Sequence, residues 1–207
     1  MSEANKNITV AEPAALGLFG LAVATFVAST QKLGVTSGLS FVLPWIIFLG
    51  AFAQLFAAIA DSKRNNIFGV TAFGAYSFFW MAVAFSWLIK MGVFGQGLAL
   101  DVDVKQIGFA FIGYLIFSLY MTIAAMETNK VLLAILILID FLFIGLICTT
   151  FGYMPEIFAP VAGVSELAIA LVSFYGSAAV VLNVHFGREF LPMGKPLGIL
   201  KKHSSKK

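Results

Sequence analysis

Five polar side chains interrupt the long apolar stretches of this sequence, and their types could do chemistry there. They are Gln54, Thr71, Tyr76, Asp140 and Asn183. An ionisable side chain at the centre of a membrane-spanning helix costs roughly 2.5–3.5 kcal/mol on insertion scales, so it usually faces water, an ion path or a bonding partner. We therefore expect Asp140, within LILIDFLF, to titrate or to face a solute, with a structural hydrogen bond to a neighbouring helix as the alternative. Gln54 and Thr71 could equally join helices by hydrogen bonds.

The elements that must position these side chains are membrane-spanning helices. Of the 207 residues, 60% are hydrophobic and only 11% are charged, against about 45–50% and about 25% in soluble domains. The apolar runs are continuous and reach the roughly 20 residues that a helix needs to cross the hydrocarbon, unlike the alternating segments of a barrel. We predict an all-α integral membrane protein with six transmembrane helices, at about residues 13–32, 41–61, 67–90, 106–126, 131–152 and 164–184.

The distribution of basic residues predicts the orientation of the chain. Of the 13 Lys and Arg residues, all but Lys32, Lys90 and Lys105 are expected on the side that holds both termini. An excess of basic residues marks the cytoplasmic side, so both termini are expected there. Cleavage of the first helix as a signal peptide would carry the basic tail outside, against this bias. The expected division is a cytoplasmic N-terminal lead, a six-helix transmembrane domain and a basic cytoplasmic tail, at residues 1–12, 13–184 and 185–207.

Patterns that would indicate an enzyme or a metal site are missing from the sequence. It contains no GxxxxGK[ST], HExxH, CxxC or GxSxG, and its two histidines, His185 and His203, have no ligand-rich neighbourhood. The single Cys148 cannot form an intrachain disulfide. The longest loops, expected at about 91–105 and 152–164, leave no room for a soluble domain. We expect no enzyme, no metal and no cofactor, and therefore a bundle that moves a solute, senses one or assembles.

A stripe of small residues follows one face of the first helix. Gly17, Gly20, Ala24 and Ala28 recur at spacings of three and four. Because lipid supplies little hydrophobic drive between helices, close packing there relies on small residues that let backbones approach. We expect this stripe to pack against another helix, and lining of a solute path is the alternative.

Three ordered stretches resemble the acetate uptake transporter family, which includes bacterial succinate-acetate permeases and fungal proteins related to acetate uptake and ammonia export. NIFGVTAFGAYSFFW, residues 66–80, resembles the family signature Asn-x-Phe-Gly-x-Thr-Ala-Phe-x-x-Tyr-x-x-Phe-Trp. GAFAQLFAAIAD, residues 50–61, is similar to the family's second helix and supplies its glutamine and its acid. LNVHFGREFLPMG, residues 182–194, resembles the closing motif. The resemblance covers about residues 11–197.

The start of the first helix resembles the family's opening motif, Asn-Pro-Ala-Pro-Leu-Gly-Leu. Glu12 replaces the asparagine and Ala15 replaces the second proline. The resemblance implies that Glu12, Pro13, Leu16 and Gly17 form a cytoplasmic entry motif. Pro13 suits a first helical turn, and Glu12 is expected to accept hydrogen bonds from the free N–H groups at the positive end of the helix.

The resemblance also implies a six-helix protomer with its own pore, assembled as a homohexamer. It places the pore constriction at Leu21, Tyr76 and Ile139, and it makes Asp140, beside Ile139, a candidate for proton coupling. A carboxylate in a low-dielectric path needs hydroxyl or amide donors. The substrate path is accordingly expected to include Thr25, Gln54, Thr71 and Asn183.

The function implied by the resemblance is a channel or proton-linked transporter in the plasma membrane for acetate and related short-chain carboxylates, with succinate as a candidate. Two alternatives remain: an exporter of ammonium or another small solute, and a non-transporting membrane sensor. The exporter predicts solute movement that carboxylates do not compete with. A lack of flux for every small acid would favour the sensor. The expected partners are the carboxylate, the lipid bilayer and further copies of the chain, and nucleic acid is not expected.

Overall fold

The computed structural model describes residues 11–200, and the remainder of the expected lead and tail, including Lys6 and the final lysines, lies outside the described residues. Six helices are long and apolar enough to cross a membrane. They are α1 (Ala14–Lys32), the continuous helix Val42–Lys63, α4 (Ile67–Lys90), α6 (Val104–Ala125), α7 (Lys130–Thr150) and α8 (Pro155–Phe186). The prediction of six membrane-spanning helices is therefore confirmed, and residues 11–200 contain no strand.

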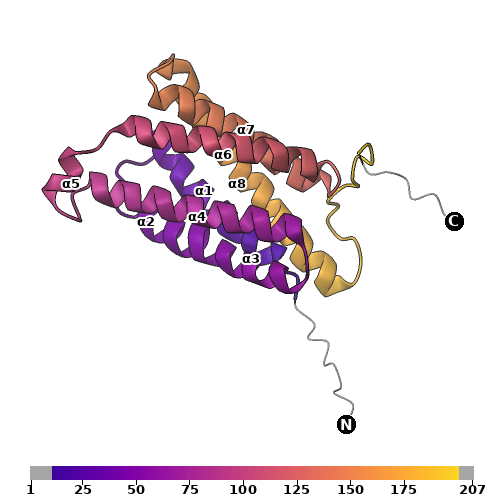
Figure 1. Ribbon diagram of the computed structural model, residues 1–207. Helices are drawn as coiled ribbons and strands as arrows, with labels where there is room; N and C mark the ends of the chain where they lie inside the picture. Colours follow the sequence, from indigo (N-terminus) through magenta and orange to yellow (C-terminus); the bar gives the residue numbers. More distant parts are fainter. Residues whose placement is uncertain (1–10, 201–207) are drawn as a thin grey trace, which may run out of the picture.

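The helices form a ring that runs the length of the bundle. On one side of α1 lie α8, α7 and α6 in turn, and on the other side lie the helix Val42–Lys63 and then α4. The ring closes between α4 and α6 through aromatic side chains such as Phe79 and Tyr114, whose ring centroids lie 4.9 Å apart, and Tyr114 Oη donates to the carbonyl oxygen of Ala75 at 2.9 Å. Figure 1 shows both described ends of the chain at one end of the bundle and the short helix α5 (Gln96–Leu100) at the other.

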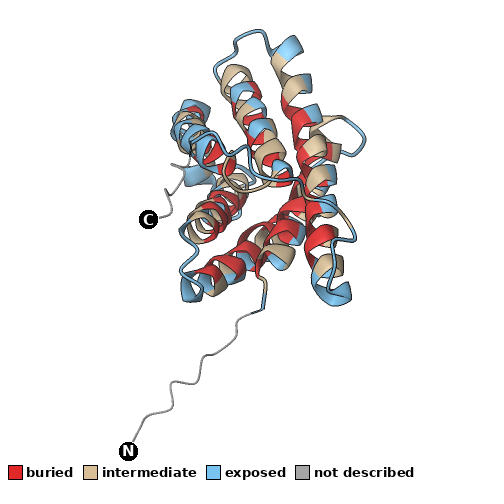
Figure 2. Ribbon diagram, turned by 90° about the vertical axis from the view of Figure 1, so that its right-hand side faces the viewer, coloured by how far each residue is buried: buried red, intermediate tan, exposed pale blue. Residues whose placement is uncertain are grey.

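Burial is concentrated on the helix faces that point into the ring (Figure 2). Large apolar side chains such as Phe48, Phe56 and Phe78 remain exposed on the outer faces, each more than half accessible. In a membrane protein such faces suit lipid tails, so their exposure agrees with the membrane assignment.

The helix Val42–Lys63 consists of three parts. These are α2 (Val42–Trp45), the π-helix η1 (Ile46–Ala53) and α3 (Gln54–Lys63). Wider π-helical turns occur frequently at functional sites. Gln54 follows this wide turn directly, is fully buried, and donates from Nε2 to the carbonyl oxygen of Gly50 at 2.8 Å. The π-helix thus ends where a polar side chain enters the bundle.

The small-residue stripe of α1 packs against η1, which confirms the predicted helix contact. Gly20 lies so close to the backbone oxygen of Leu49 that a Cβ atom would collide with it. Further along, a Cβ atom on Gly50 would lie 3.0 Å from Cβ of Ala24. The two backbones can approach this closely because neither surface carries a large side chain.

The last helix begins at Pro155 rather than at residue 164, so most of the loop expected at 152–164 is helical. Pro155 stands at the start of the helix, where its fixed φ and missing N–H are favourable. Glu156 in the first turn complements the positive end of the helix dipole. Pro160 is accommodated soon after, where it removes one hydrogen bond near the helix end.

The closing motif at residues 182–194 fastens the chain to the bundle after α8. Asn183 Nδ2 donates to the carbonyl oxygen of Leu191 at 2.9 Å, and its Oδ1 accepts from the N–H groups of Phe190 and Leu191 at 2.7 and 2.9 Å. Farther on, the N–H of Leu197 donates to the carbonyl oxygen of Met126 at 2.8 Å, in the turn between α6 and α7. The motif therefore has a structural role in this chain.

Candidate functional site

Three cavities follow one another inside the helix ring. The largest, about 240 Å³, is lined by Lys32 and Glu166 and is called the Lys32-end cavity. The second, about 70 Å³, is lined by Asp61 and is called the Asp61-end cavity. Between them lies a central void of about 20 Å³. Since about 10–15 Å³ is needed to hold one water, the centre of the bundle is closed to anything larger than a water molecule.

The side chains at the narrow section come from three helices. Leu21 of α1, Tyr76 of α4 and Ile139 of α7 line both the Asp61-end cavity and the central void. Each is at most 6% exposed. The three residues that the resemblance assigns to the constriction thus come together at the boundary between two cavities.

The wall on the other side of the central void is aromatic and aliphatic. Phe79, Trp80 and Leu142 line both the central void and the Lys32-end cavity. Phe79 packs edge-on against Trp80 and against Phe143, with ring centroids 5.5 and 5.4 Å apart. Each cavity therefore shares wall residues with the next one along the bundle. A solute crossing the bundle would pass between these side chains.

Tyr76 supplies the available hydroxyl at the narrow section. Its Oη is buried beside Ser118 Oγ of α6, and within residues 11–200 neither hydroxyl makes a well-aligned hydrogen bond. Its ring packs edge-on against Phe117 at 5.5 Å. The other nearby hydroxyl is committed, because Thr25 Oγ1 donates to the carbonyl oxygen of Leu21 at 2.7 Å. Tyr76 Oη can donate to Ser118 Oγ, or to a polar solute that replaces Ser118 as its partner at the narrowest point.

The polar groups of the Asp61-end cavity lie near the start of α4. Asn66 Nδ2 donates to Asp61 Oδ1 at 2.9 Å, and Asn66 Oδ1 accepts from the N–H of Gly69 at 3.2 Å. A side chain at Gly69 would collide with the Asp61 carboxyl. The positive end of the α4 dipole favours a carboxylate here. Gln54 also lines this cavity. One N–H of its Nε2 donates to the carbonyl oxygen of Gly50, and the second N–H can donate to a solute.

The prediction that Glu12 accepts hydrogen bonds from the free N–H groups at the start of α1 is wrong in this structure. Glu12 Oε2 lies 2.6 Å from Nη1 of Arg64, in the turn between α3 and α4. Within the described chain, the start of α1 has no side-chain cap, and Pro13 occupies the N-cap position. A full guanidinium charge in reach attracts the carboxylate more strongly than the partial charge of a helix end.

The other members of the predicted entry motif do not line the Asp61-end cavity. Leu16 is 45% exposed on the outer face of α1, and Gly17 is buried against the ring of Phe73. Ala14 and Leu18 line the cavity instead. The helix rotation between adjacent residues explains the difference, because Leu18 and Leu16 lie on opposite faces of α1.

Asp140 faces a neighbouring helix. Thr122 Oγ1 of α6 donates to Asp140 Oδ2 at 2.8 Å. Asp140 is not among the described residues that line the three cavities, although the adjacent Ile139 is. The geometry supports the structural hydrogen bond between helices for Oδ2, while Oδ1 is buried and has no hydrogen-bond partner among residues 11–200.

Two further predicted path residues lie away from the cavities, and two cavity residues were not predicted. Within the described chain, neither the half-buried Thr71 nor the tail-binding Asn183 lines any of the three cavities. Lys32 and Glu166 line the Lys32-end cavity. A signal existed for Glu166, because an ionisable residue inside the helix predicted from residue 164 is exceptional.

Known proteins share this sequence pattern and this fold. The chain is 30% identical over 191 residues to the succinate-acetate/proton symporter SatP of Escherichia coli strain K12, covering 91% of this chain and 98% of that protein. Acetate permease A of Emericella nidulans is 27% identical over 143 residues, covering 65% of this chain and 47% of the permease.

The solved structure of the bacterial acetate channel SatP superimposes with a TM-score of 0.83 at 28% identity, covering 90% of this chain and all of that one (100%). The family model that matches is described as the GPR1/FUN34/yaaH family, and it matches residues 2–192. That span includes all six helices and all three cavities. This chain therefore belongs to the GPR1/FUN34/yaaH family.

Proposed function

We propose that this protein is a channel or proton-linked transporter that carries acetate and related short-chain carboxylates across the plasma membrane. The observation that supports this proposal is the series of three cavities, narrowed where Leu21, Tyr76 and Ile139 meet. The relatives reported above are named for transport of acetate, not for catalysis. The narrow section restricts the path to small solutes, and its closure means that transport requires side-chain movement.

The lining suits a molecule with one carboxylate and one methyl group. An uncompensated carboxylate in an apolar environment is costly, so each section of the path must offer a donor. Gln54 Nε2 offers one in the Asp61-end cavity, which the Asp61 carboxyl also lines. Tyr76 Oη offers one at the narrow section when it turns from Ser118. Leu21 and Ile139 can contact the methyl group. Weak binding at several points favours rapid passage over tight capture.

The orientation and assembly of the protein follow from the sequence and the resemblance. With both termini in the cytoplasm, the lead at 1–12 and the tail at 185–207 are cytoplasmic, the Asp61 end faces the cytoplasm, and the Lys32 end faces outward. The resemblance implies assembly as a homohexamer. Light scattering of the purified protein would measure the number of copies directly.

The direct test is uptake of labelled acetate into proteoliposomes that contain the purified protein. We expect saturable uptake that unlabelled short carboxylates inhibit. Measurement at two pH values, with and without an imposed pH gradient, separates a proton-linked transporter from a passive channel. Ammonium movement without carboxylate competition would instead support an exporter of ammonium. A lack of flux for every small acid would support a non-transporting sensor.

We expect Asp140→Asn to transport acetate close to the wild-type rate and to respond normally to a pH gradient, because Asp140 lines none of the three cavities. The folded state should lose about 1 kcal/mol, since a neutral amide accepts a weaker hydrogen bond from Thr122 than a carboxylate does. Thermal unfolding in detergent measures the second effect, and Thr122→Val should lower the midpoint further, because it leaves Asp140 Oδ2 buried without a donor. Loss of gradient-stimulated uptake in a well-folded Asp140→Asn protein would assign proton coupling to Asp140 after all.

A further inference from the structure

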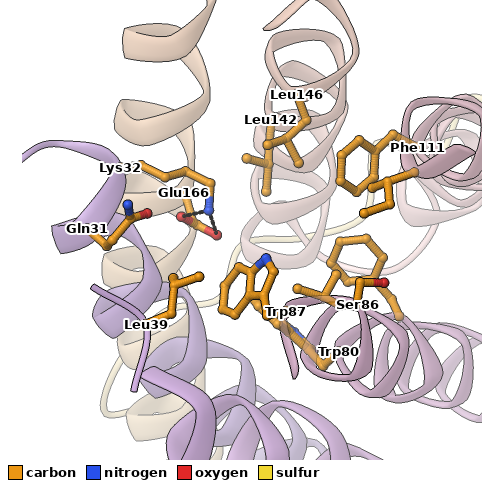
Figure 3. Close-up of a pocket in the computed structure, with 13 residues that line it drawn as sticks. Gln31, Lys32, Leu39, Trp80, Ser86, Trp87, Phe111, Leu142, Leu146 and Glu166 are labelled. Atoms are coloured by element: carbon orange, nitrogen blue, oxygen red, sulfur yellow. Dashed lines mark hydrogen bonds and ion pairs between the residues drawn. The ribbon is translucent and has the colours of Figure 1, made fainter. Parts of the chain in front are cut away.

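An ion pair borders the Lys32-end cavity. Lys32 Nζ lies 2.9 Å from Oε2 and 3.2 Å from Oε1 of Glu166. Figure 3 shows the pair on one side of the cavity, with Trp87, Leu142 and Phe111 around it. The two residues are 134 positions apart in the sequence, so the pair joins the end of α1 to α8.

The packing of α1 on α8 holds the two charges together. Gly163 lies against Leu33, and a Cβ atom there would lie 2.8 Å from Leu33 Cδ2 and 3.5 Å from Lys32 Cβ. Glu166 follows Gly163 by one helical turn and lies on the same face of α8. The ammonium of Lys32 is also favoured by the negative end of the α1 dipole. The pair is thus positioned by backbone packing.

The two partners face the cavity unequally. The Glu166 side chain is 2% exposed, and both of its oxygens accept from Lys32. The Lys32 side chain is 21% exposed. An ammonium has three N–H donors, and two of them satisfy Glu166, which leaves one donor for a ligand in the cavity. The exposed member of the pair is therefore the cation, although the pair as a whole is neutral.

The other walls of the cavity are mostly apolar. Trp80, Trp87, Phe111 and Leu142 supply aromatic and aliphatic surface. Ser86 also lines the cavity, but its hydroxyl donates to the carbonyl oxygen of Ala82 at 2.8 Å. A carboxylate beside Lys32 would find a donor. Gln31, next to Lys32, supplies a side-chain amide to the lining, and a second carboxylate beyond the reach of Gln31 would lie against apolar walls at a high desolvation cost.

We propose that Lys32 binds the carboxylate of a small monocarboxylate in the Lys32-end cavity and that Glu166 restricts this site to a single negative charge. The inference rests on the proposed function and names its substrate class. Lys32 attracts the anion and supplies its hydrogen bond. Glu166 neutralises most of the ammonium charge, so the anion is held weakly and a dicarboxylate is disfavoured.

The decisive variant reverses the pair, with Lys32→Glu and Glu166→Lys in one protein. A pair that only joins α1 to α8 would survive this exchange, whereas a carboxylate ligand would now meet an exposed carboxylate. Binding can be followed without transport, because Trp80 and Trp87 line the cavity and a Trp45→Phe background removes the third tryptophan. Titration with acetate and with succinate then reports the Kd of each through tryptophan fluorescence.

We expect the reversed pair to weaken acetate binding about tenfold or more, as loss of a charged hydrogen bond and a new repulsion require. Glu166→Gln should act in the opposite direction: it should tighten acetate binding and tighten succinate binding by a larger factor, because Lys32 is no longer neutralised. This variant keeps the proposal testable if the reversed pair fails to fold, since damage to the fold does not tighten binding.

Equal acetate binding by the wild type and a folded reversed pair would overturn the proposal, and so would a wild-type fluorescence that does not respond at acetate concentrations that saturate uptake. Uptake measured on the same preparations separates this inference from the proposed function. Fluorescence-detected binding that depends on Lys32, without any uptake, would keep the site and refute transport. Normal uptake by the reversed pair would keep transport and refute the site.

Discussion

Replacement of Ile139 by tryptophan is expected to lower acetate uptake by about tenfold or more, because pore width controls passage. Ile139 borders both the Asp61-end cavity and the central void, which measures only about 20 Å³. An indole ring at this position would fill the void and contact Leu21 and Tyr76. Initial rates of labelled-acetate uptake in proteoliposomes, normalised to the amount of protein inserted, measure the effect.

The same helix offers a matched control. Ile137 lies two residues earlier on α7 and is 40% exposed on the outer face, so Ile137→Trp adds the same ring without narrowing the cavities. Its uptake should remain near that of the wild type. Ile139→Ala should widen the narrow section and raise the rate. A well-folded Ile139→Trp protein with normal uptake would show that the solute crosses elsewhere.

The second large effect concerns stability. Gly20→Ala should lower the free energy of unfolding by about 1–3 kcal/mol, the usual cost of overpacking a tight interface. The added methyl group would collide with the backbone oxygen of Leu49, which cannot rotate away as a side-chain tip can. Separation of α1 from η1 is the only relief. The unfolding midpoint of the purified protein, by heat or by a denaturing detergent, measures the loss.

Gly74→Ala provides a control with the opposite sign. Gly74 lies in the middle of α4, and a Cβ atom there would lie 3.7 Å from Cβ of Ala58, an ordinary contact. Replacement of glycine by alanine inside a helix stabilises by roughly 0.5–1 kcal/mol when space allows. If both variants unfold at the same midpoint, the contact between Gly20 and Leu49 does not limit stability.

The fold class was predictable because membrane insertion is a local property of the sequence. A run of about 20 apolar residues crosses the bilayer as a helix whatever its neighbours do. The small-residue stripe that includes Gly20 and Ala24 was equally local, since its spacing defines a helix face. The start of the last helix was missed because Pro155 and Pro160 resemble loop residues, although proline is favourable in a first helical turn.

Which polar residues border the cavities was decided only by the tertiary structure. Lipid and protein interior are both apolar, so hydrophobic periodicity hardly distinguishes the inner face of a membrane helix from the outer one. Ile139 therefore lines the narrow section while the adjacent Asp140 bonds to Thr122. The pairing of Lys32 with Glu166 depends on contact between α1 and α8, the first and last membrane helices. The sequence determined the six helices, and their packing determined which side chains a solute would meet.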